Sequence, residues 1–525
     1  MIINKLRRVR IVVSLIFFIA TSLLFLELSS SYTRLLSDEI LFFQFIPSLV
    51  SFIHTTSIAA AGFVLFLIIA MLFGRIYCSS VCPLGFLIDV INRISQWIHK
   101  RKRKRIRFIF KQSFNKLRYS FLIATAVLFV FGVSTGIVLL DPFSNFGRLV
   151  TKFARPVLVA INNIAVLVLE QFDNYSLPPF AWDVFDFQFF IYPLLFLIIL
   201  VALSYKHGRL YCNAVCPVGS LLGWISKYSF YKIVVDDSTC TECGLCEKSC
   251  KAECINSAEK YIDMSRCISC FNCFDSCASN SLSFEPRYVS NSTSDDVEES
   301  SSKRSFLIST GLMSLALVKK VYSQNKVLVY TQNEIPENRL SPISPPGSIS
   351  INHFVTNCTA CTLCVSACPT KVLQPSLFEY GLQGMLIPRM NNSAGYCNYE
   401  CTICSEVCPN EAILPIELEK KKFTQIGKVE FVKDNCVVYT QKTECGACAE
   451  HCPTKAVRMD LDPELNLRVP VTDNKICVGC GACEYACPTI PYKAIYVQGN
   501  VEHLIAEKPK EEDLQEVEPT EEFPF

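Results

Sequence analysis

The sequence predicts a multi-domain protein in which a four-helix transmembrane unit is joined to small, cysteine-rich domains that hold metal centres. Three observations lead to this prediction. The 525 residues exceed the usual size of one domain, so about two to four units are expected. Uncharged apolar stretches of membrane-spanning length recur within residues 1–225. Nearly all of the 29 cysteines lie in regularly spaced groups, which favours metal centres over a disulfide scaffold.

The transmembrane unit is predicted over residues 1–225. Ile11–Leu26 is uncharged, follows a basic N-terminus and precedes no small-residue cleavage site, which indicates a span rather than a signal peptide. Ile40–Gly74 is too long for one span, so we expect an interfacial or re-entrant piece before Pro47 and a helix ending near Gly74. Two further spans and one short interfacial or packed helix complete the unit: Tyr119–Leu140, Phe187–Tyr205 and, for the short helix, Pro156–Leu169.

The distribution of charge predicts the orientation of this unit. Lys100–Arg107 carries seven Lys or Arg residues in eight positions, and with the basic N-terminus and Lys206–Arg209 it marks these loops as cytoplasmic. The loops after the first and third spans are acidic and fit the outer side. Both ends of the unit are therefore expected inside, at a cytoplasmic membrane. The basic block adjoins a span and carries no recognition motif, so no nucleic-acid partner is predicted.

Two stretches of the membrane unit repeat one pattern, Gly-Arg-x-Tyr-Cys-x-x-x-Cys-Pro-x-Gly. They are Gly74–Gly85 and Gly208–Gly219, and each follows the cytoplasmic end of a span. The duplication implies two similar halves that face one another, so their four thiols could converge at the membrane surface. These thiols are Cys78, Cys82, Cys212 and Cys216. The spacing leaves three roles open: a metal or cluster site, redox-active thiols, or structural cysteines.

Residues 226–285 contain two cysteine runs with the same 2-2-3 spacing. The first three cysteines of a run can hold three corners of one iron–sulfur cube, and the fourth is left for the other cube. Zinc sites are usually built from Cys-x2-4-Cys pairs instead. The runs are Cys240, Cys243, Cys246, Cys250 and Cys267, Cys270, Cys273, Cys277. They resemble a bacterial-type two-[4Fe–4S] ferredoxin, which implies an α+β domain, although Lys251 and Ala278 replace the usual prolines. Cys254 lies outside any motif and is predicted to be a small packed residue.

Residues 286–345 are predicted to be a linker that contains an export signal or anchor. Ser290–Ser302 is rich in serine and acidic residues, as solvated linkers are. The segment 302–320 then resembles a twin-arginine signal, with Lys303 before Arg304 in place of the first arginine. Its apolar run is short for a span, so a buried core helix is the alternative. An export signal here would carry the following domain, already folded, to the outer side.

Residues 346–500 hold a second field of four cysteine runs, and the fourth cysteine of every run precedes a proline. Sixteen ligands imply four clusters, but the spacing does not tell which run lends its fourth cysteine to which. The runs are Cys358, Cys361, Cys364, Cys368; Cys397, Cys401, Cys404, Cys408; Cys436, Cys445, Cys448, Cys452; and Cys477, Cys480, Cys483, Cys487. Residues 501–525 form an acidic tail that is predicted to be disordered.

The combination of these parts is similar to two known families. The four spans, the two repeats and the two-cluster domain look like the NapH-type membrane ferredoxin of periplasmic nitrate reductase systems, a subunit of quinol dehydrogenase type. Regulators of nitrous-oxide respiration share that membrane unit, but their flavin-bearing domain has no counterpart here. The last field resembles the exported four-cluster ferredoxins of the NapG/MauM type. The resemblance implies a fusion of the two in a multi-pass inner-membrane protein whose C-terminal domain is extracytoplasmic.

We therefore expect a membrane-bound electron-transfer protein of anaerobic respiration, which is an electron-transfer subunit rather than a free-standing enzyme. At least six [4Fe–4S] clusters, or seven with the repeat cysteines, would pass electrons from the membrane quinone pool to an extracytoplasmic reductase. Iron in the clusters is the only metal expected, and no catalytic residue is identified. His54, near an outer membrane edge, could bond a quinol or be an ordinary interfacial histidine. A regulatory or maturation factor and a cytoplasmic ferredoxin-linked relay are the alternatives.

Overall fold

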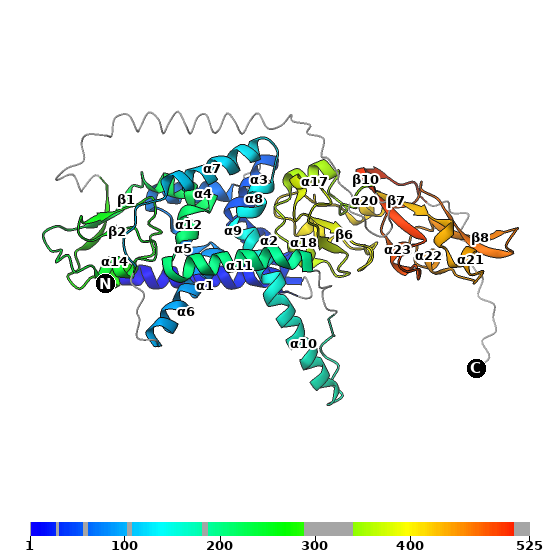
Figure 1. The fold of residues 1–525 in the computed structure, drawn as a ribbon, viewed down its shortest axis with the longest axis horizontal. Coiled ribbons are helices and arrows are strands. Elements are labelled where there is room, and N and C mark those ends of the chain that lie inside the picture. The colour runs from blue at the N-terminus through cyan, green and yellow to red at the C-terminus, as the bar shows by residue number, and fades with distance from the viewer. Residues whose placement is uncertain are drawn as a thin grey trace.

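The computed structural model of the chain describes residues 2–27, 31–55, 61–101, 108–180, 187–287 and 340–508. These residues form an elongated molecule with three parts in a row (Figure 1). A helical unit lies in the middle, a small domain built from residues 231–287 lies at one end, and residues 340–508 lie at the other. Most of the linker with Lys303 and Arg304, most of the acidic tail and the side chain of His54 lie outside the described residues.

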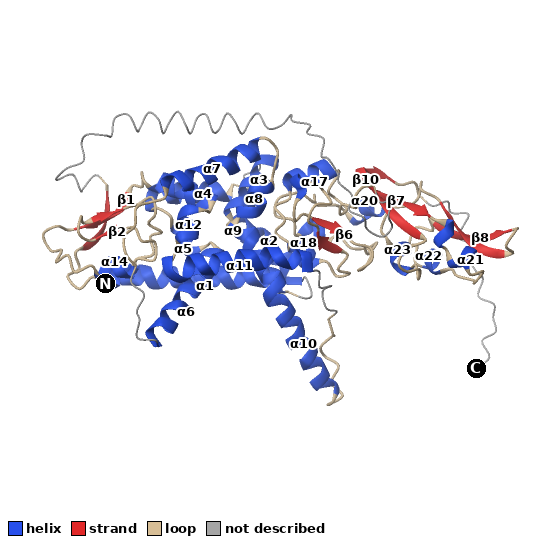
Figure 2. Cartoon of the chain, in the orientation of Figure 1, coloured by secondary structure: helices blue, strands red, loops and turns tan. Residues whose placement is uncertain are grey.

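The central part of the molecule is helical (Figure 2). A short π-helical turn, η2 (Val150–Ala154), precedes α10. Its helices are α1 (Ile2–Leu26), α2 (Ser31–Phe42), α3 (Phe45–Thr55), α4 (Gly62–Phe73), α5 (Ile76–Ser80), α6 (Pro83–Arg101), α7 (Asn115–Val130), α8 (Thr135–Leu140), α9 (Pro142–Leu149), α10 (Arg155–Glu170), α11 (Phe187–His207), α12 (Leu210–Ala214) and α13 (Pro217–Ser226). Helices α1 and α11 run along the longest axis, whereas α6 and α10 project away from it (Figure 1).

Three helical stretches in the described residues are long and apolar enough to cross a membrane. Leu6–Leu26 and Phe189–His207 lie where the sequence predicts spans. The third, Pro142–Glu170, extends far beyond the short helix predicted for residues 156–169. In the sequence, the apolar run begins only after the charged residues that precede Pro156, so the prediction starts the helix there. In the structure, Arg148 and Arg155 are buried by contacts with the protein, and the helix continues through them.

One predicted span is interrupted, and a break that the sequence predicts is present. Tyr119–Leu140 is not one helix, because the backbone turns between α7 and α8 at Gly132, whose φ is 79°. Helices α2 and α3 form a bent pair with an angle of 94°, and the break falls before Pro47, where a re-entrant or interfacial piece is expected. Counting this pair as one broken span brings the total to four. The helical region therefore holds three or four apolar helices rather than four straight spans.

The small domain has the α+β composition of a ferredoxin. Its elements are β1 (Tyr231–Val235), α14 (Leu245–Ser249), β2 (Ile255–Asn256), β3 (Tyr261–Ile262), α15 (Asn272–Ser276) and β4 (Leu282–Pro286). The first and last strands pair antiparallel, with Ile233 opposite Phe284, and β2 pairs with β3. This topology brings the two ends of the domain together and folds the two cysteine runs back against each other.

The C-terminal part also combines short helices with two-stranded sheets. Its elements are α17 (Ile351–Asn357), α18 (Leu363–Ala367), β5 (Leu373–Pro375), η4 (Leu382–Gly384), β6 (Pro388–Met390), α19 (Ile403–Glu406), α20 (Leu418–Phe423), β7 (Thr424–Phe431), η5 (Lys433–Asn435), α21 (Val437–Thr440), α22 (Ala447–Glu450), β8 (Val457–Asp462), β9 (Leu467–Thr472), α23 (Ala482–Ala486) and β10 (Ile495–Ile505). All of its sheets are antiparallel: β5 pairs with β6, β7 with β10 and β8 with β9.

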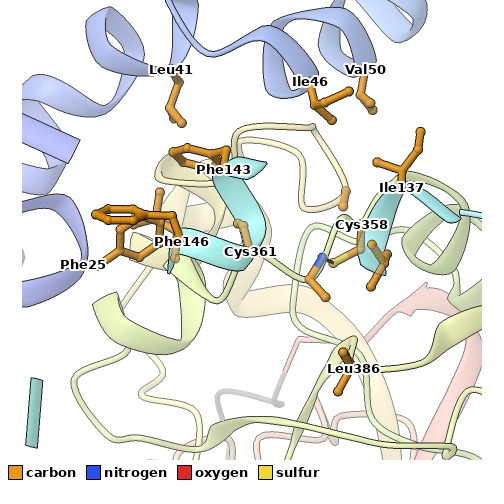
Figure 3. Close-up of a cluster of buried hydrophobic side chains, with 14 of the residues drawn as sticks. Phe25, Leu41, Ile46, Val50, Ile137, Phe143, Phe146, Cys358, Cys361 and Leu386 are labelled. Carbon is orange, nitrogen blue, oxygen red and sulfur yellow. Dashed lines mark hydrogen bonds between the residues drawn. The ribbon is translucent and has the colours of Figure 1, made fainter. Parts of the chain in front are cut away.

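The core of the helical unit continues into the C-terminal part. Phe143 and Phe146 on α9 lie among Phe25, Leu41 and the cysteine loops of the C-terminal part (Figure 3). Helix α9 starts here because Asp141 caps it, accepting from the backbone N–H groups of Phe143 (3.2 Å) and Ser144 (2.9 Å), with Pro142 in its first turn. A shared apolar core of this kind fixes one domain on the other.

Candidate functional site

The two cysteine runs of the small domain line two separate cavities. Each cavity is bordered by the first three cysteines of one run and the fourth cysteine of the other. One cavity is lined by Cys240, Cys243, Cys246 and Cys277. The other is lined by Cys250, Cys267, Cys270 and Cys273. Exchange of the fourth cysteine is the ligand arrangement of two-cluster ferredoxins.

Cys254 is a fifth thiol at the second of these cavities. It is buried, as the sequence predicts, but it also lines the cavity, with its Sγ 3.5 Å from Cys250 Sγ. The hydrogen bond between the two sulfurs lowers the pKa of Cys250 and so favours its thiolate in the metal-free protein. Cysteine spacing gives no sign of this contact, since Cys254 falls outside the 2-2-3 pattern.

The first two runs of the C-terminal part exchange their fourth cysteines in the same way. One cavity is lined by Cys358, Cys361, Cys364 and Cys408. Its neighbour is lined by Cys368, Cys397, Cys401 and Cys404. The enlarged gap after Cys397 leaves this arrangement intact. The structure thus answers the pairing question that the spacing leaves open for these runs.

The last two runs also pair with each other. Cys487 lies close enough to Cys436 and Cys448 to interact with them electrostatically. Cys452 interacts in the same way with Cys477 and Cys480. Burial raises the pKa of Cys477 to about 11 and that of Cys480 to about 12, so both thiols carry protons at neutral pH in the metal-free chain. Binding of a metal centre must therefore displace these protons.

The geometry of these groups fits clusters better than single ions. Among the described residues, no group of three or more His, Cys, Asp or Glu side chains is arranged to hold one metal ion. A structural zinc ion needs its sulfur ligands about 2.3 Å from a common point. The thiols instead border spaces that are each lined by four cysteines, three from one run and one from its partner, as the donors of an iron–sulfur cube would be.

The repeat cysteines converge on a fifth cavity of this kind, which we call the central site. Cys78, Cys82, Cys212 and Cys216 are all buried and together line one enclosed space. Tyr77, Tyr211 and Pro142 also form part of its wall. The structure therefore unites the four thiols whose convergence the repeat predicts, and it encloses them away from solvent.

The repeated pattern can be explained residue by residue. Gly74 and Gly208 end α4 and α11 with φ angles of 84° and 59°, a region that favours glycine. The first cysteine of each repeat then lies on a short helix, α5 or α12. The proline after the second cysteine starts the next helix, since Pro83 opens α6 and Pro217 opens α13. Each repeat is thus a helix end, a short thiol-bearing turn and a new helix start.

The arginines of the two repeats cross over to the opposite half. Arg75 donates from Nη2 to the Cys212 carbonyl at 3.1 Å and lies 3.8 Å from Cys78 Sγ. Arg209 donates from Nη1 to the Cys78 carbonyl at 2.8 Å. Both guanidinium groups are fully buried. This exchange ties the two halves together around the thiols.

The last glycine of each repeat makes room for this crossover. A Cβ atom at Gly85 would lie 2.8 Å from Arg209 Nη1, and one at Gly219 would lie 2.8 Å from Arg75 Nη2. Each would also collide with the carbonyl of the first cysteine of its own repeat. Arginine and glycine are therefore coupled across the pair, which sequence reasoning missed although both residues stand in the repeat.

On one side, the central site contacts the small ferredoxin-like domain. The backbone N–H of Arg209 donates to the Lys251 carbonyl at 2.9 Å, next to Cys250. Asp89 on α6 binds Arg209 at 2.9 Å and Lys251 at 3.3 Å. Arg75 Nη1 donates to the Ser265 carbonyl at 3.2 Å, two residues before Cys267. Both repeats thus reach a cysteine loop of that domain.

On the other side, the central site connects to the C-terminal part through α9. Pro142 at the start of α9 lines the central cavity, and Arg148 at its end reaches the first cysteine loop. Arg148 donates from Nε to the Ala360 carbonyl at 2.8 Å and from Nη2 to the Thr359 carbonyl at 3.0 Å. Further along, the Cys397 N–H donates to the Cys480 carbonyl at 2.9 Å and joins the two cysteine pairs of the C-terminal part.

Comparison with known families agrees with these sites. A family described as "4Fe-4S binding domain" matches residues 56–105 and 189–233, the segments that contain the two repeats. A family described as "4Fe-4S dicluster domain" matches residues 396–456 and 441–490, and a second family of the same description matches residues 263–372.

Two curated proteins are similar to part of this chain. "Ferredoxin-type protein NapF" of Escherichia coli (strain K12) is 30% identical over 160 residues, which cover 30% of this chain and 87% of NapF. "Methylamine utilization ferredoxin-type protein MauM" of Methylophilus methylotrophus is 30% identical over 158 residues, 29% of this chain and 69% of MauM. No solved structure gives a significant match.

Proposed function

The chain belongs to the family of ferredoxin-type [4Fe–4S] proteins, and we propose that it conducts electrons across a membrane along one series of seven four-cysteine sites. A [4Fe–4S] cluster bound in such a site supplies a one-electron carrier. The six ferredoxin-type sites and the central site together use seven times four, or 28, of the 29 cysteines, all except Cys254. The chain's own part is to hold these sites in order and to shield them from water.

The observation that carries this proposal is the position of the central site between the two ferredoxin-like parts. Contacts from Arg75 and Arg209 run from its cysteines to the loops around Cys250 and Cys267. Contacts from α9 run from its opposite wall to the loop around Cys358 and Cys361. Without a carrier at the central site, the two parts would be separated by the helical unit.

Helix α1 supports a path that crosses the membrane. Its 25 residues span about 37 Å at 1.5 Å per residue, which exceeds the ~30 Å hydrocarbon core of a bilayer. Near its start, Arg7 forms an ion pair with Asp275 on α15 of the small domain. Near its end, Phe25 packs with Phe143, and the helix contacts α18 of the C-terminal part. The two ferredoxin-like parts therefore flank one membrane-length helix.

The charge pattern supports the orientation in which the small domain is cytoplasmic and the C-terminal part is extracytoplasmic. The likeness to NapH-type and NapG/MauM-type proteins supports quinol as the electron donor and an extracytoplasmic reductase as the acceptor. A quinol releases two electrons and two protons when it becomes a quinone. The electrons would enter the chain one at a time, and the protons would leave to the aqueous phase.

Quinol-driven reduction tests this electron source. We expect a reduced menaquinol or ubiquinol analogue, added anaerobically to membranes that hold the protein, to bleach the visible absorbance of its iron–sulfur clusters. The bleaching should be stoichiometric, with two electrons delivered per quinol oxidised. A matched sample of membranes lacking the protein gives the background. Fully loaded protein that no quinol reduces would contradict quinol oxidation and favour a maturation factor or a cytoplasmic relay.

Iron content tests the number of sites. We expect anaerobically purified protein to hold about 28 iron atoms, four for each of seven cubes. The Cys78→Ser/Cys212→Ser double variant should hold about 24, because only the central site loses its ligands. Replacement of Cys254, which lies at a cavity but outside the seven sets, is the matched control and should leave the iron content unchanged. About 24 iron atoms in both the wild type and the double variant would show that the central thiols hold no cluster.

A further inference from the structure

Arg75 is a buried cation at the centre of the proposed electron path. Its guanidinium group is fully buried, and it lies 3.8 Å from Cys78 Sγ. Besides this sulfur, its hydrogen-bond acceptors are the Asn213 side-chain oxygen (2.8 Å) and the carbonyls of Cys212 (3.1 Å) and Ser265 (3.2 Å). All three acceptors are neutral, so none of them compensates the positive charge.

The other repeat arginine is in a different electrostatic situation. Arg209 contacts the carboxylate of Asp89 at 2.9 Å, and its charge is therefore offset nearby. Among the described residues, no carboxylate lies within ion-pair distance of Arg75, and its Nε is buried without a hydrogen-bond acceptor. Burying a guanidinium without a compensating anion is unfavourable, because its charge loses its hydration. The chain therefore needs an anion next to Arg75, and the nearest candidates are the four thiolates of the central site.

We propose that Arg75 is the counter-charge of the central site and holds its reduction potential up. This inference rests on the proposed function, in which these four cysteines hold a redox centre. Reduction adds one negative charge to that centre, and a nearby cation without a carboxylate partner stabilises the reduced form more than the oxidised form. Arg209 contributes less, because Asp89 opposes its field. Arg75 is thus a positioning residue that tunes the site and ties it to the loop at Ser265.

Two variants test the charge of Arg75, one by removing it and one by offsetting it. Arg75→Met deletes the guanidinium, whereas Asn213→Asp keeps it and adds a carboxylate at the atom that already accepts its hydrogen bond. We expect both variants to lower the midpoint potential of the central site by about 59 mV or more. For a one-electron couple this shift is a tenfold change in the equilibrium constant of reduction. Arg75→Lys keeps the charge and should leave the potential within that limit.

The measurement is an anaerobic redox titration of the full-length protein followed by electron paramagnetic resonance. The signal of the central site is the one that the Cys78→Ser/Cys212→Ser variant lacks, and iron content reports independently whether the site is loaded. Arg118→Gln is the matched control. Arg118 is also fully buried and also donates to the Ser265 carbonyl, at 2.9 Å, but it touches none of the central thiols. Its replacement should shift the potential by less than Arg75→Met does.

The outcomes separate this inference from the function on which it rests. If the wild type holds no iron at the central site, both are wrong. If the site is loaded but its potential stays within the tenfold limit in Arg75→Met and Asn213→Asp, the inference alone is wrong. An equal shift of the midpoint potential in Arg118→Gln would also overturn the inference. The loss of any buried positive charge would then lower the potential, and Arg75 would have no special role. If Arg75→Met fails to load the site, Asn213→Asp decides, since it leaves the guanidinium in place.

Discussion

Loss of the central thiols is expected to cut the chain into two electrically separate halves. The experiment uses proteoliposomes in which the small domain faces outward and meets dithionite, a reductant that does not cross the bilayer. In the wild type, all clusters should bleach, because electrons pass through the central site to the C-terminal part. In the Cys78→Ser/Cys212→Ser variant, only the two clusters of the small domain should bleach. The remaining four should keep their oxidised absorbance, which is two thirds of the signal from the six ferredoxin-type clusters.

Two controls make this result specific. Dithionite added after detergent lysis should bleach all six remaining clusters of the variant, which shows that they are assembled and reducible. A membrane-permeant redox mediator should restore bleaching without lysis, because it bypasses the central site. Complete bleaching of the variant in sealed vesicles without a mediator would mean that the repeat cysteines are structural. It would also mean that electrons take another route between the two parts.

The C-terminal part is expected to be exposed on the outside of the cell while the small domain stays inside. In intact spheroplasts, added protease should remove residues 340–508 and leave residues 231–287 protected. The physical reason is that the two parts flank the membrane-length helix α1, while the basic loops hold the small domain on the cytoplasmic side. Immunoblots against a tag at each end of the chain report the two halves separately.

Export of the C-terminal part across the membrane is expected to depend on the twin-arginine-like segment. A domain that is already folded around clusters cannot pass through a channel for unfolded chains. Arg304→Gln should therefore leave the C-terminal part protected in spheroplasts and reduce the yield of loaded protein. Arg287→Gln, which removes a basic residue outside that segment, serves as the matched control and should behave like the wild type. A C-terminal part that is cleaved only after lysis in the wild type would contradict the topology and favour a cytoplasmic relay.

Cysteine spacing was sufficient to predict the ferredoxin-like parts. The spacing of a 2-2-3 run is sufficient because three thiols within seven residues can face one point, while the fourth faces another. The structure has this arrangement in both runs of the small domain, where Cys277 joins the first cavity and Cys250 the second. In the C-terminal part the spacing identifies the runs as cluster ligands, but the pairing of the runs within Cys358–Cys408 comes from the structure.

Apolar runs and charges predicted the long apolar helices less well. α1 and α11 lie where apolar runs indicate them, because nothing interrupts those runs. The length of the helix from Pro142 to Glu170 was underestimated. Arg148 and Arg155 look like helix boundaries in the sequence, but tertiary contacts bury them. Conversely, Tyr119–Leu140 looks continuous, but the backbone turns at Gly132. Local hydropathy cannot tell whether a charge meets water or a carbonyl group.

The sequence by itself determined the features that depend on neighbours along the chain. These are the cysteine runs, the duplicated repeat and the uninterrupted apolar helices. Only the tertiary structure decided which runs exchange cysteines, that Cys254 touches a cavity, and that the repeat thiols meet between the two ferredoxin-like parts. It also decided that Arg75 crosses to the opposite repeat while Asp89 offsets Arg209. The physical reason is that burial, charge compensation and the closing of a four-thiol cavity all depend on residues far apart in sequence.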